Sequence, residues 1–580
     1  MYQQNVEFIE ARDDPDGTSW SGRFSLPFIE PTTHVSLEKQ MSTCAPSASS
    51  RLHIRAWPRS FPARQLGMWL ASLWLAAAPI AQALPAMPVH GEADVHSKGK
   101  VTIDGHGKLD YDAEAGLLPI LDDTTGRLMA SVFYVSYSTA PTTASPRPIT
   151  FVWNGGPGSN SAQLHMGVGP KRLDTADRLP DWTPSQSERP LVNNADSWLG
   201  ASDLVFVDPV GSGYSRAVDA KDLPILYSSH GDAEVFAEAI RVYLTRHDAW
   251  NRPLYLAGES YGVIRAMLVA EALERRATPV RGVVLISYNF DLGTPTPAYP
   301  EDALNLPQFT AAAHYHQRLD PALQALDENA AVAQAQAWTQ QEYLPFFANP
   351  KAQTTEARSR ILAGLARFTG LHEKDIDPAK LTVSTADFAD RLLADSGLEL
   401  GRYDLRMTAP RRAEGTAWLP WIDPSLTPMK GLMNGTSRVF NRYLHQQLGF
   451  ESDLLYRGPF GNAFHPQPLL NDPKTGFPDD WTAVLWNFDG MAPTGTDAPL
   501  RKAMDRNPQL RVLTLRGRYD GWPCESSVES TRAAEPRYAS RITNLCLQGG
   551  HMWYSERASR SEGRHAFEQF LATDPPSSAD

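Results

Sequence analysis

The chain has 580 residues, of which 42% are apolar and 21% are charged, and this composition is typical of a globular protein. Its length exceeds what one hydrophobic core usually holds, so we expect either a large core with an insertion or two domains. The 54 basic and 66 acidic residues give a net charge of −12, which argues against a nucleic-acid partner.

An apolar segment near the N-terminus predicts an export signal. Residues 66–83 are strongly apolar, follow a stretch with four arginines, and end in the small-residue triplet Ala-Gln-Ala. A signal peptidase needs such an ending, so we expect cleavage after Ala83 and no stable membrane insertion afterwards. An uncleaved membrane anchor is the alternative, which Pro79 disfavours, and a buried core helix is a third. The mature protein is then periplasmic or secreted.

The predicted export signal also affects where translation is expected to start and which cysteines the mature protein contains. Residues 1–40 are polar and lack sustained periodicity, so we expect translation to begin at or near Met41. Cys44 leaves with the signal, and Cys524 and Cys546 remain. Two cysteines in an exported chain suggest one disulfide, with unpaired buried thiols as the alternative. The chain has no CxxC pair and no HExxH motif, so we predict neither a metal site nor another cofactor.

The first part of the mature chain is typical of strands. Residues 108–120 and 128–137 are extended, and the turn residues 122–126 between them favour an antiparallel hairpin at a sheet edge. The apolar strand 149–153 leads into residues 154–161, NGGPGSNS. Their glycines leave backbone N–H groups bare, as half of an oxyanion hole requires. A phosphate-binding loop is the alternative, disfavoured because no Gly-Lys-Ser or Gly-Lys-Thr follows.

Strands then alternate with helices. Residues 204–208 form an apolar run, and Phe236, Ile240 and Tyr243 follow the spacing of a helix. Residues 283–287 form a further apolar run after the next helix. Such alternation predicts a mostly parallel sheet.

Residues 254–262, LYLAGESYG, carry the strongest single motif. A short strand ends in glycines two positions before and two after Ser260, and a helix follows, which is the layout of a nucleophile elbow. The tight turn needs both glycines, since side chains there would clash. Ser260 is the only serine flanked in this way. A glycine-rich turn without chemistry is the alternative.

The alternation of strands and helices is interrupted between about 290 and 480. This stretch is rich in alanine, helix-forming and aromatic residues, and it predicts a helical cap over the mouth of the site. We expect its aromatic cluster to form the cap's own core rather than a ligand surface. The cluster consists of Trp338, Tyr343, Phe346 and Phe347.

The sheet pattern resumes with strands at 511–515 and 542–547, and the loops that follow them supply two more catalytic candidates. Asp520 follows the first strand, and His551 follows the second after a Gly-Gly turn. The order Ser260, Asp520, His551 is that of an α/β-hydrolase triad. A serine needs a histidine to take its proton, and the histidine needs a carboxylate to hold it.

We therefore predict an α/β-hydrolase fold with a mostly parallel central sheet, antiparallel N-terminal edge strands and a large, mainly helical cap insertion. The cap separates the nucleophile from the acid and the histidine in sequence. The predicted parts are an N-terminal extension with the signal, 1–83, the first part of the hydrolase domain, 84–290, the cap, 291–480, and the second part of the hydrolase domain, 481–580.

Five motifs occur in a fixed order, and together they resemble the serine carboxypeptidase family. They are residues 154–158, residues 208–215, residues 258–262, Asp520, and residues 550–552, and they span most of the chain from about 105 to 570. The stretch 258–265 is more similar to exported bacterial members than to eukaryotic vacuolar ones. The resemblance implies hydrolysis of peptides with a free C-terminus, which releases the C-terminal residue through an acyl-enzyme.

The resemblance also implies roles for single residues. Gly156 and Tyr261 donate the backbone hydrogen bonds of the oxyanion hole, and Asn154 and Glu259 bind the terminal carboxylate of the substrate. Glu259 can donate a hydrogen bond to a carboxylate only when it is protonated, because two anions repel each other. Acidic conditions should therefore favour substrate binding.

Two positions depart from the family pattern. The chain has Gly167 where the family has a second glutamate, so we expect a weaker grip on the terminal carboxylate. It has Ser159-Asn160 where the family has Cys-Ser, so the disulfide anchored there is missing. A bond between Cys524 and Cys546 is expected to tie the aspartate loop to the histidine strand instead.

Two other functions stay open. An esterase or acyltransferase with the same triad is suggested by Gly167, since a fold alone does not determine the substrate. A catalytically silent binding protein on a hydrolase scaffold is the alternative from another class.

Overall fold

The computed structural model describes residues 94–140, 146–174, 190–287, 299–458 apart from 414, 417, 419–421, 434 and 436, and 498–573. All of these residues belong to the unit Leu84–Asp580. The predicted signal, 66–83, and Cys44 lie outside them. No helix within the described ranges is long and apolar enough to span a bilayer.

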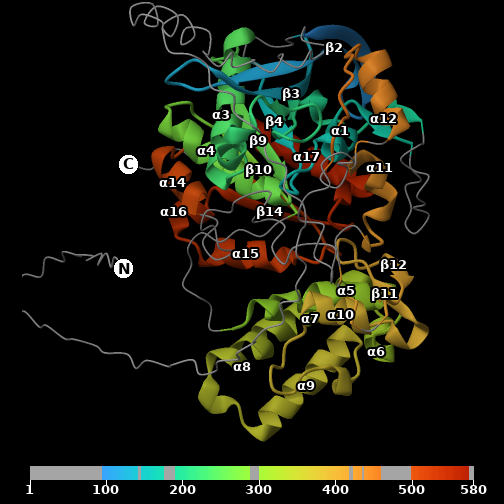
Figure 1. Cartoon of the computed structure of the whole chain (residues 1–580). Coiled ribbons are helices and arrows are strands. Elements are labelled where there is room, and N and C mark those ends of the chain that lie inside the picture. The colour runs from blue at the N-terminus through green and yellow to red at the C-terminus, as the bar shows by residue number, and fades with distance from the viewer. Residues whose placement is uncertain are drawn as a thin grey trace, which may run out of the picture. The chain divides into compact units, whose positions relative to one another are not determined.

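A central sheet organises the described chain (Figure 1). Its strands are β1 Val95–Ile103, β2 Gly107–Leu121, β3 Leu128–Ser138, β4 Ile149–Trp153, β7 Asp203–Val207, β8 Arg216–Ala217, β9 Leu254–Glu259, β10 Gly282–Ile286, β13 Arg511–Gly517 and β14 Ile542–Leu547. Neighbouring strands follow the order β1-β2-β3-β7-β4-β9-β10-β13-β14, and β8 pairs with β3. The pairs from β1 to β7 are antiparallel, whereas those from β7 to β14 are parallel. The predicted α/β-hydrolase class is confirmed.

The predicted hairpin forms the antiparallel edge. Strands β2 and β3 are paired, and Asp122 in the turn between them accepts hydrogen bonds from the backbone of Thr124 and Thr125. Strand β1, which no sequence pattern predicts, pairs with β2 along its whole length. Only Val101 and Ile103 of β1 are buried, so the strand lacks a long apolar run.

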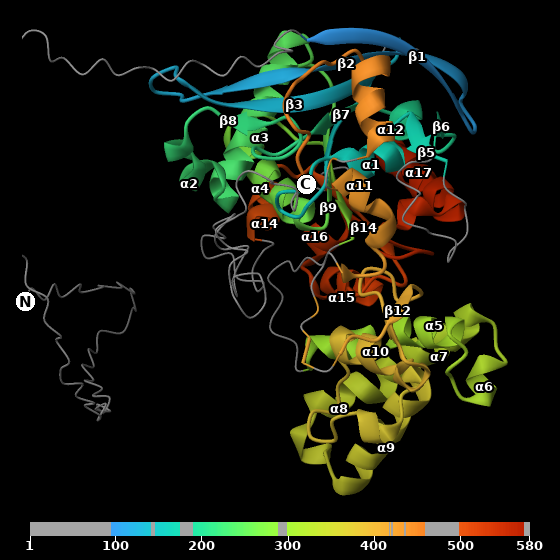
Figure 2. The ribbon, with the colours of Figure 1, turned by 45° about the vertical axis from the view of Figure 1, so that its right-hand side comes forward.

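Side chains that alternate along the parallel strands enter two different cores. In β4, Phe151 packs in a core with helices α3 (Ser229–Arg246), α4 (Tyr261–Arg275) and α14 (Ala498–Arg506). Its neighbour Val152 packs in the other core, with α1 (Ala162–Val168), α12 (Arg438–Arg442) and α17 (Arg557–Ala572). Figures 1 and 2 show α3 beside α4 on one side of the sheet. Helices thus cover both faces, which explains why every residue of β4 is buried.

Residues 301–412, here called the helical region, have a separate hydrophobic core (Figure 2). Several helices begin at a side-chain cap: Asp327 accepts from Ala330 N, and Thr354 accepts from Ala357 N. Tyr343 and Phe346 are buried in this core, as the sequence predicts. The elements of the region are α5 Leu306–Tyr315, α6 Pro321–Gln324, α7 Glu328–Trp338, α8 Leu344–Ala348, α9 Thr355–Thr369, α10 Thr385–Arg391 and the strand pair β11 Leu398–Leu400 and β12 Thr408–Pro410.

The segment after the helical region packs differently. Leu432, Phe440 and Tyr443 belong to the core beneath the sheet that contains α1 and α17, not to the core of the helical region. They lie on α11 (Lys430–Met433), on α12 and on the π-helical turn Tyr443–Gln447. The stretch expected as one cap, 291–480, therefore contributes to two hydrophobic cores, and the division into domains stays a prediction.

Candidate active site

Ser260 lies on a strained turn between β9 and α4. Its φ of 56° and ψ of −128° are unusual for a residue with a side chain. A Cβ on Gly258 would lie 1.9 Å from the carbonyl oxygen of Gly262, and one on Gly262 would lie 2.9 Å from the ring of Trp153. The two flanking glycines are thus steric requirements of the turn. They lift the serine out of the strand, as a nucleophile elbow requires.

The glycine loop after β4 rests directly on this elbow. A Cβ on Gly155 would lie 2.5 Å from the backbone nitrogen of Tyr261 and 2.6 Å from the carbonyl oxygen of Glu259. Gly156 has a φ of 106°, a conformation that favours glycine. The backbone of the loop and the amide of Tyr261 are therefore in close contact, which suits a shared oxyanion-binding site.

A buried arginine holds the loop and the elbow together. Arg265, one turn along α4 from the serine, forms an ion pair with Asp232 of α3, with Nε and Oδ2 2.6 Å apart. Its two terminal nitrogens donate to the carbonyl oxygens of Asn154, at 3.0 Å, and Pro157, at 2.8 Å. These carbonyls lie on either side of the two loop glycines. Arg265 therefore fixes the glycine loop against the helix that carries the nucleophile.

The predicted acid and histidine meet at the ends of the last two strands. His551 Nδ1 and Asp520 Oδ2 are 2.8 Å apart, and both side chains are buried. Burial lowers the pKa of His551, but the charge and hydrogen bond of Asp520 outweigh it, so the pKa of the histidine is raised. This pairing leaves Nε2 of the imidazole for a second partner, as the triad requires.

The elbow and the histidine loop are both anchored at the end of β10. The amide of Ser260 donates to the carbonyl of Ile286, the last residue of that strand, at 2.9 Å. The hydroxyl of the next residue, Ser287, donates to the carbonyl of His551 at 2.6 Å. Because β9, β10, β13 and β14 run parallel, their C-terminal ends share one edge of the sheet. The structure thus brings the predicted nucleophile, acid and histidine to the same edge.

The predicted carboxylate-binding pair is buried beside the elbow. The Asn154 amide nitrogen donates to Glu259 Oε2, and the Asn154 oxygen accepts from the backbone of Leu164 at 3.0 Å, so the amide is oriented. The Tyr554 hydroxyl donates to the same carboxyl, at 3.0 and 3.1 Å from its two oxygens. Burial raises the pKa of Glu259 to about 7. The carboxyl can therefore exchange its proton near neutral pH.

Three functional candidates were missed by the sequence analysis. Arg265 interrupts the buried first part of α4, residues 261–270, and a lone charge in such a run is the signal that points to it. Tyr554 follows His551 by three residues, and nothing in the sequence alone indicates its contact with Glu259. Asp232 lies in α3 and is buried, which raises its pKa to about 6.

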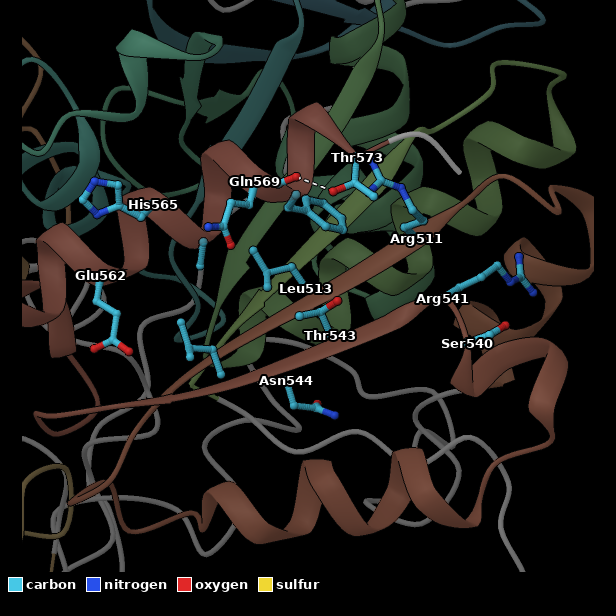
Figure 3. A pocket seen from close by; sticks show the side chains of 13 residues that line it. Arg511, Leu513, Ser540, Arg541, Thr543, Asn544, Glu562, His565, Gln569 and Thr573 are labelled. Atoms are coloured by element: carbon cyan, nitrogen blue, oxygen red, sulfur yellow. Dashed lines mark hydrogen bonds between the residues drawn. The ribbon is translucent and has the colours of Figure 1, made fainter. Parts of the chain in front are cut away.

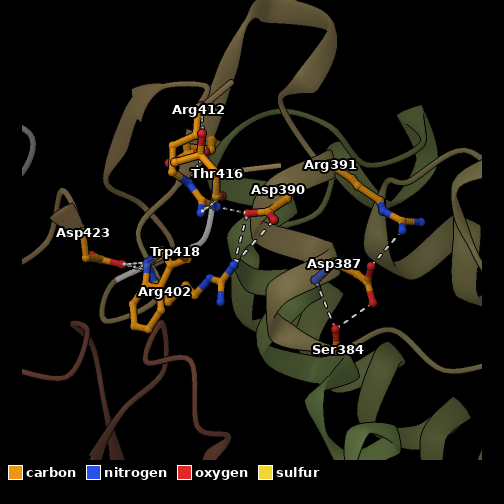
Figure 4. A network of polar contacts seen from close by, with 10 residues as sticks. Ser384, Asp387, Asp390, Arg391, Arg402, Arg412, Thr416, Trp418 and Asp423 are labelled. Atoms are coloured by element: carbon orange, nitrogen blue, oxygen red, sulfur yellow. Dashed lines mark hydrogen bonds and ion pairs between the residues drawn. The ribbon is translucent and has the colours of Figure 1, made fainter. Parts of the chain in front are cut away.

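Aromatic side chains surround the histidine. The ring centroids of Tyr403 and Trp522 lie 5.1 and 5.4 Å from that of His551. The Tyr403 ring also lies 6.0 Å from Trp418, over which the Arg402 guanidinium is placed at 4.6 Å (Figure 4). Tyr403 of the helical region thus lies next to His551, and Trp418 of the segment after it contacts Tyr403.

Cys524 and Cys546 form a disulfide, with Cα atoms 5.7 Å apart. It joins the start of α15 (Cys524–Ala533), just after the aspartate loop, to β14, which leads into the histidine loop. Within the described ranges, no group of three or more His, Cys, Asp or Glu side chains is arranged to hold a metal ion.

A separate hollow of about 620 Å³ lies between α17 and strands β13 and β14. Arg511, Arg541, Glu562 and His565 are among the side chains around it (Figure 3). None of the predicted catalytic or carboxylate-binding residues lines this hollow. It is therefore distinct from the candidate active site.

Comparisons with known sequences agree with these motifs. Residues 106–289 match the profile of a family described as serine carboxypeptidase. The pheromone-processing carboxypeptidase kex1 of Aspergillus niger is 32% identical over 146 residues, which cover 25% of this chain and 22% of that protein. Its counterpart in Penicillium rubens is 31% identical over 165 residues, which cover 28% and 24%. The chain thus matches about a quarter of the length of these relatives, and the likeness to exported bacterial members stays a prediction.

Two solved structures with distant similarity illustrate the comparison with known folds. Proline iminopeptidase from Mycobacterium smegmatis aligns with 79% of this chain and 97% of its own, at 14% identity and a TM-score of 0.28. Esterase E22 aligns with 80% and 100%, at 12% identity and a TM-score of 0.33.

Proposed function

We propose that this chain, whose residues 106–289 match a family described as serine carboxypeptidase, is a serine-type carboxypeptidase that releases C-terminal residues from peptides. The observation that carries the proposal is the hydrogen bond between His551 and Asp520, at the same sheet edge as the strained Ser260. These are the groups that acyl transfer through a serine needs.

In the proposed reaction, His551 takes the proton of Ser260 while the serine oxygen attacks the carbonyl carbon of the last peptide bond. Asp520 stabilises the imidazolium that forms. The backbone amides of Gly156 and Tyr261 donate to the oxyanion of the tetrahedral intermediate. The imidazolium then protonates the leaving amine, and water, activated by the same histidine, hydrolyses the acyl-enzyme.

The choice of the C-terminal bond is assigned to Asn154 and Glu259. Protonated Glu259 donates a hydrogen bond to the terminal carboxylate of the substrate, and the Asn154 amide donates a second one. Because the pKa of Glu259 is about 7, the protonated form prevails below this pH and is lost as the pH rises above it. Binding of free-acid peptides should therefore weaken on the alkaline side.

The test compares three blocked substrates that share one acyl group: a dipeptide with a free C-terminus, its amide, and a simple ester. We expect kcat/KM for the free acid to exceed that for the amide at pH 6. Ser260→Ala should lower kcat for every substrate by about 10⁴-fold or more. A strong preference for the ester, with acid and amide alike, would instead indicate the esterase or acyltransferase.

Labelling with a fluorophosphonate tests the catalytically silent alternative. A competent triad should give stoichiometric label on Ser260, and the label should be absent in Ser260→Ala. A protein that stays unlabelled while folded would be a binding protein on a hydrolase scaffold.

Export is a separate part of the proposal. The mature protein is periplasmic or secreted and begins at Leu84 after signal cleavage. Mass spectrometry of the N-terminus of the purified protein measures this directly. A mature chain that retains residues before Leu84 would contradict the cleavage.

A further inference from the structure

Tyr554 contacts the predicted carboxylate-binding site from the histidine loop. It lies on the 3-10 turn Trp553–Ser555, three residues after His551. Its hydroxyl donates to Glu259, at 3.0 Å from Oε1 and 3.1 Å from Oε2, and both side chains are buried. Burial and the nearby carboxylate raise the pKa of Tyr554 well above its usual value, so the phenol remains a neutral donor.

The Tyr554 ring occupies the space beside Gly167. A Cβ on Gly167 would lie 2.5 Å from Cδ2 of the ring and 2.9 Å from Cγ, which is closer than real Cβ atoms come. A side chain at position 167 and the ring therefore exclude each other. The glycine at position 167 thus leaves room for the ring whose hydroxyl reaches Glu259.

We propose that Tyr554 is a positioning residue that orients Glu259 for binding the terminal carboxylate of the substrate. This inference rests on the proposed carboxypeptidase function. A phenol can only donate to a carboxyl whose own proton points elsewhere. The Tyr554 hydroxyl lies within hydrogen-bond distance of both Glu259 oxygens, and Asn154 donates to Oε2. These two donors fix the orientation of the carboxyl, so the acid proton of protonated Glu259 points away from them, where it is available to the substrate.

The arrangement has a consequence for the pH profile. A pair of acidic side chains sharing a proton would titrate in two coupled steps, whereas a tyrosine and a single carboxyl titrate in one step over the working range. KM for a free-acid peptide should therefore rise with pH through a single ionisation, that of Glu259. The phenol stabilises the ionised form of this carboxyl and so lowers its pKa.

The other charges that act on Glu259 come from the triad. Burial is the main cause of its raised pKa, His551 lowers that pKa by its charge, and Asp520 raises it. Asn154 contributes an uncharged amide. The triad acts on every substrate, whereas Glu259 binds only a terminal carboxylate. The pH profile measured with the ester, which has no such carboxylate, therefore reports the titration of His551 alone.

Tyr554→Phe tests the proposal, because it removes the hydroxyl and retains the ring beside Gly167. We expect KM for the free-acid dipeptide at pH 6 to rise by about threefold to tenfold, the loss of one hydrogen bond, with kcat nearly unchanged. The pH at which KM begins to rise should shift upward, since the ionised form of Glu259 loses a donor. Kinetics with the ester and fluorophosphonate labelling of Ser260 should stay as in the parent protein, which shows that the variant is folded.

Two further variants make the test specific. Tyr443→Phe removes another buried phenol on the same side of the sheet, one that shares a hydrogen bond of 2.6 Å with Tyr137, and it should leave the pH profile of KM unchanged. In a Glu259→Gln background, Tyr554→Phe should cause no further shift with pH.

The inference fails if Tyr554→Phe leaves both KM and its pH midpoint at the parent values while the parent prefers the free acid. It also fails if Tyr443→Phe causes the same shift, because the effect would then be general loosening of the core. If the parent protein itself shows no preference for the free acid over the amide, the proposed function fails instead.

Discussion

Two ion pairs, one at the sheet edge and one in the helical region, differ in burial. At the sheet edge, the side chains of Arg265 and Asp232 are 0% and 2% exposed, and the remaining guanidinium donors reach two loop carbonyls. In the helical region, the paired side chains of Arg412 and Asp390 are 15% and 40% exposed (Figure 4). The first pair is sealed in the core, and the second is open to water.

This difference shows which contacts maintain the catalytic geometry. A buried charge that loses its partner remains without solvation, so removing one half of a buried pair is costly. An exposed pair is screened by water, and breaking it changes stability little. We therefore expect the Arg265–Asp232 pair to hold the glycine loop rigidly, while the Arg412–Asp390 pair tolerates substitution.

Arg265→Met should cause the largest loss in the free energy of unfolding among these variants. It leaves Asp232 without a partner and two loop carbonyls without a donor, so we expect the free energy of unfolding at pH 7.5 to fall by about 3–5 kcal/mol. The kcat for the ester should fall as well, because the glycine loop loses its clamp. Denaturant unfolding and steady-state kinetics measure the two effects.

Arg275→Met is the matched control for this prediction. Arg275 lies on the same helix and pairs with Glu234, with side chains 47% and 39% exposed. Its removal should lower the free energy of unfolding by less than about 1 kcal/mol. Equal losses for the two variants would contradict the distinction between buried and exposed pairs.

Removal of the disulfide near the sheet edge should cause the next largest loss in the free energy of unfolding. Cys524 and Cys546 are 22 residues apart, and closing a loop of this length stabilises the folded state by about 3 kcal/mol through the unfolded chain. The double variant Cys524→Ser/Cys546→Ser should lose this amount in denaturant unfolding. Reductant should lower the midpoint of the parent protein and leave that of the double variant unchanged. Two titratable thiols in the unreduced parent would refute the bond.

Sequence patterns predicted the sheet well because its strands are short apolar runs between glycine-rich turns. The predicted strand 149–153 matches β4, and the predicted strand 542–547 matches β14. Strand β1 was missed because its polar side chains face solvent and only its end is buried. Pairing with β2 makes residues 95–103 a strand, although their own sequence pattern does not predict one.

In the candidate site, too, local sequence patterns predict only some of the residues. Ser260, Asp520 and His551 follow from local turn motifs, since each stands where a strand ends. Arg265 and Tyr554 act through partners that are distant in sequence: Asp232 is 33 positions from Arg265, and Glu259 is 295 positions from Tyr554. Such contacts exist only once the sheet has formed, so no local pattern predicts them.

Glu259→Gln tests whether the buried carboxyl sets the alkaline limit of substrate binding. In the parent protein, KM for the free-acid dipeptide should rise roughly tenfold for each pH unit above about 7, as the proton on Glu259 is lost. An amide side chain donates at every pH, so KM of the variant should stay constant over this range. The acidic fall in kcat, which reflects protonation of His551, should persist in both proteins. A KM that rises equally in parent and variant would assign the alkaline limit to another group.

The smallest effect is expected from Asp390→Asn in the helical region. Asp390 accepts from Arg412 at 2.9 Å and from Arg402 at 3.4 and 3.5 Å, and the latter distances indicate weak bonds. Arg412 also keeps Glu399, at 2.8 and 2.9 Å, and the Arg402 guanidinium stays over the Trp418 ring at 4.6 Å. We expect a loss of less than about 1 kcal/mol in unfolding free energy and an unchanged kcat/KM for the ester. A loss above about 2 kcal/mol would mean that this exposed network stabilises the fold as strongly as a buried pair. The exposed and buried ion pairs would then not differ in the free energy of unfolding that they contribute.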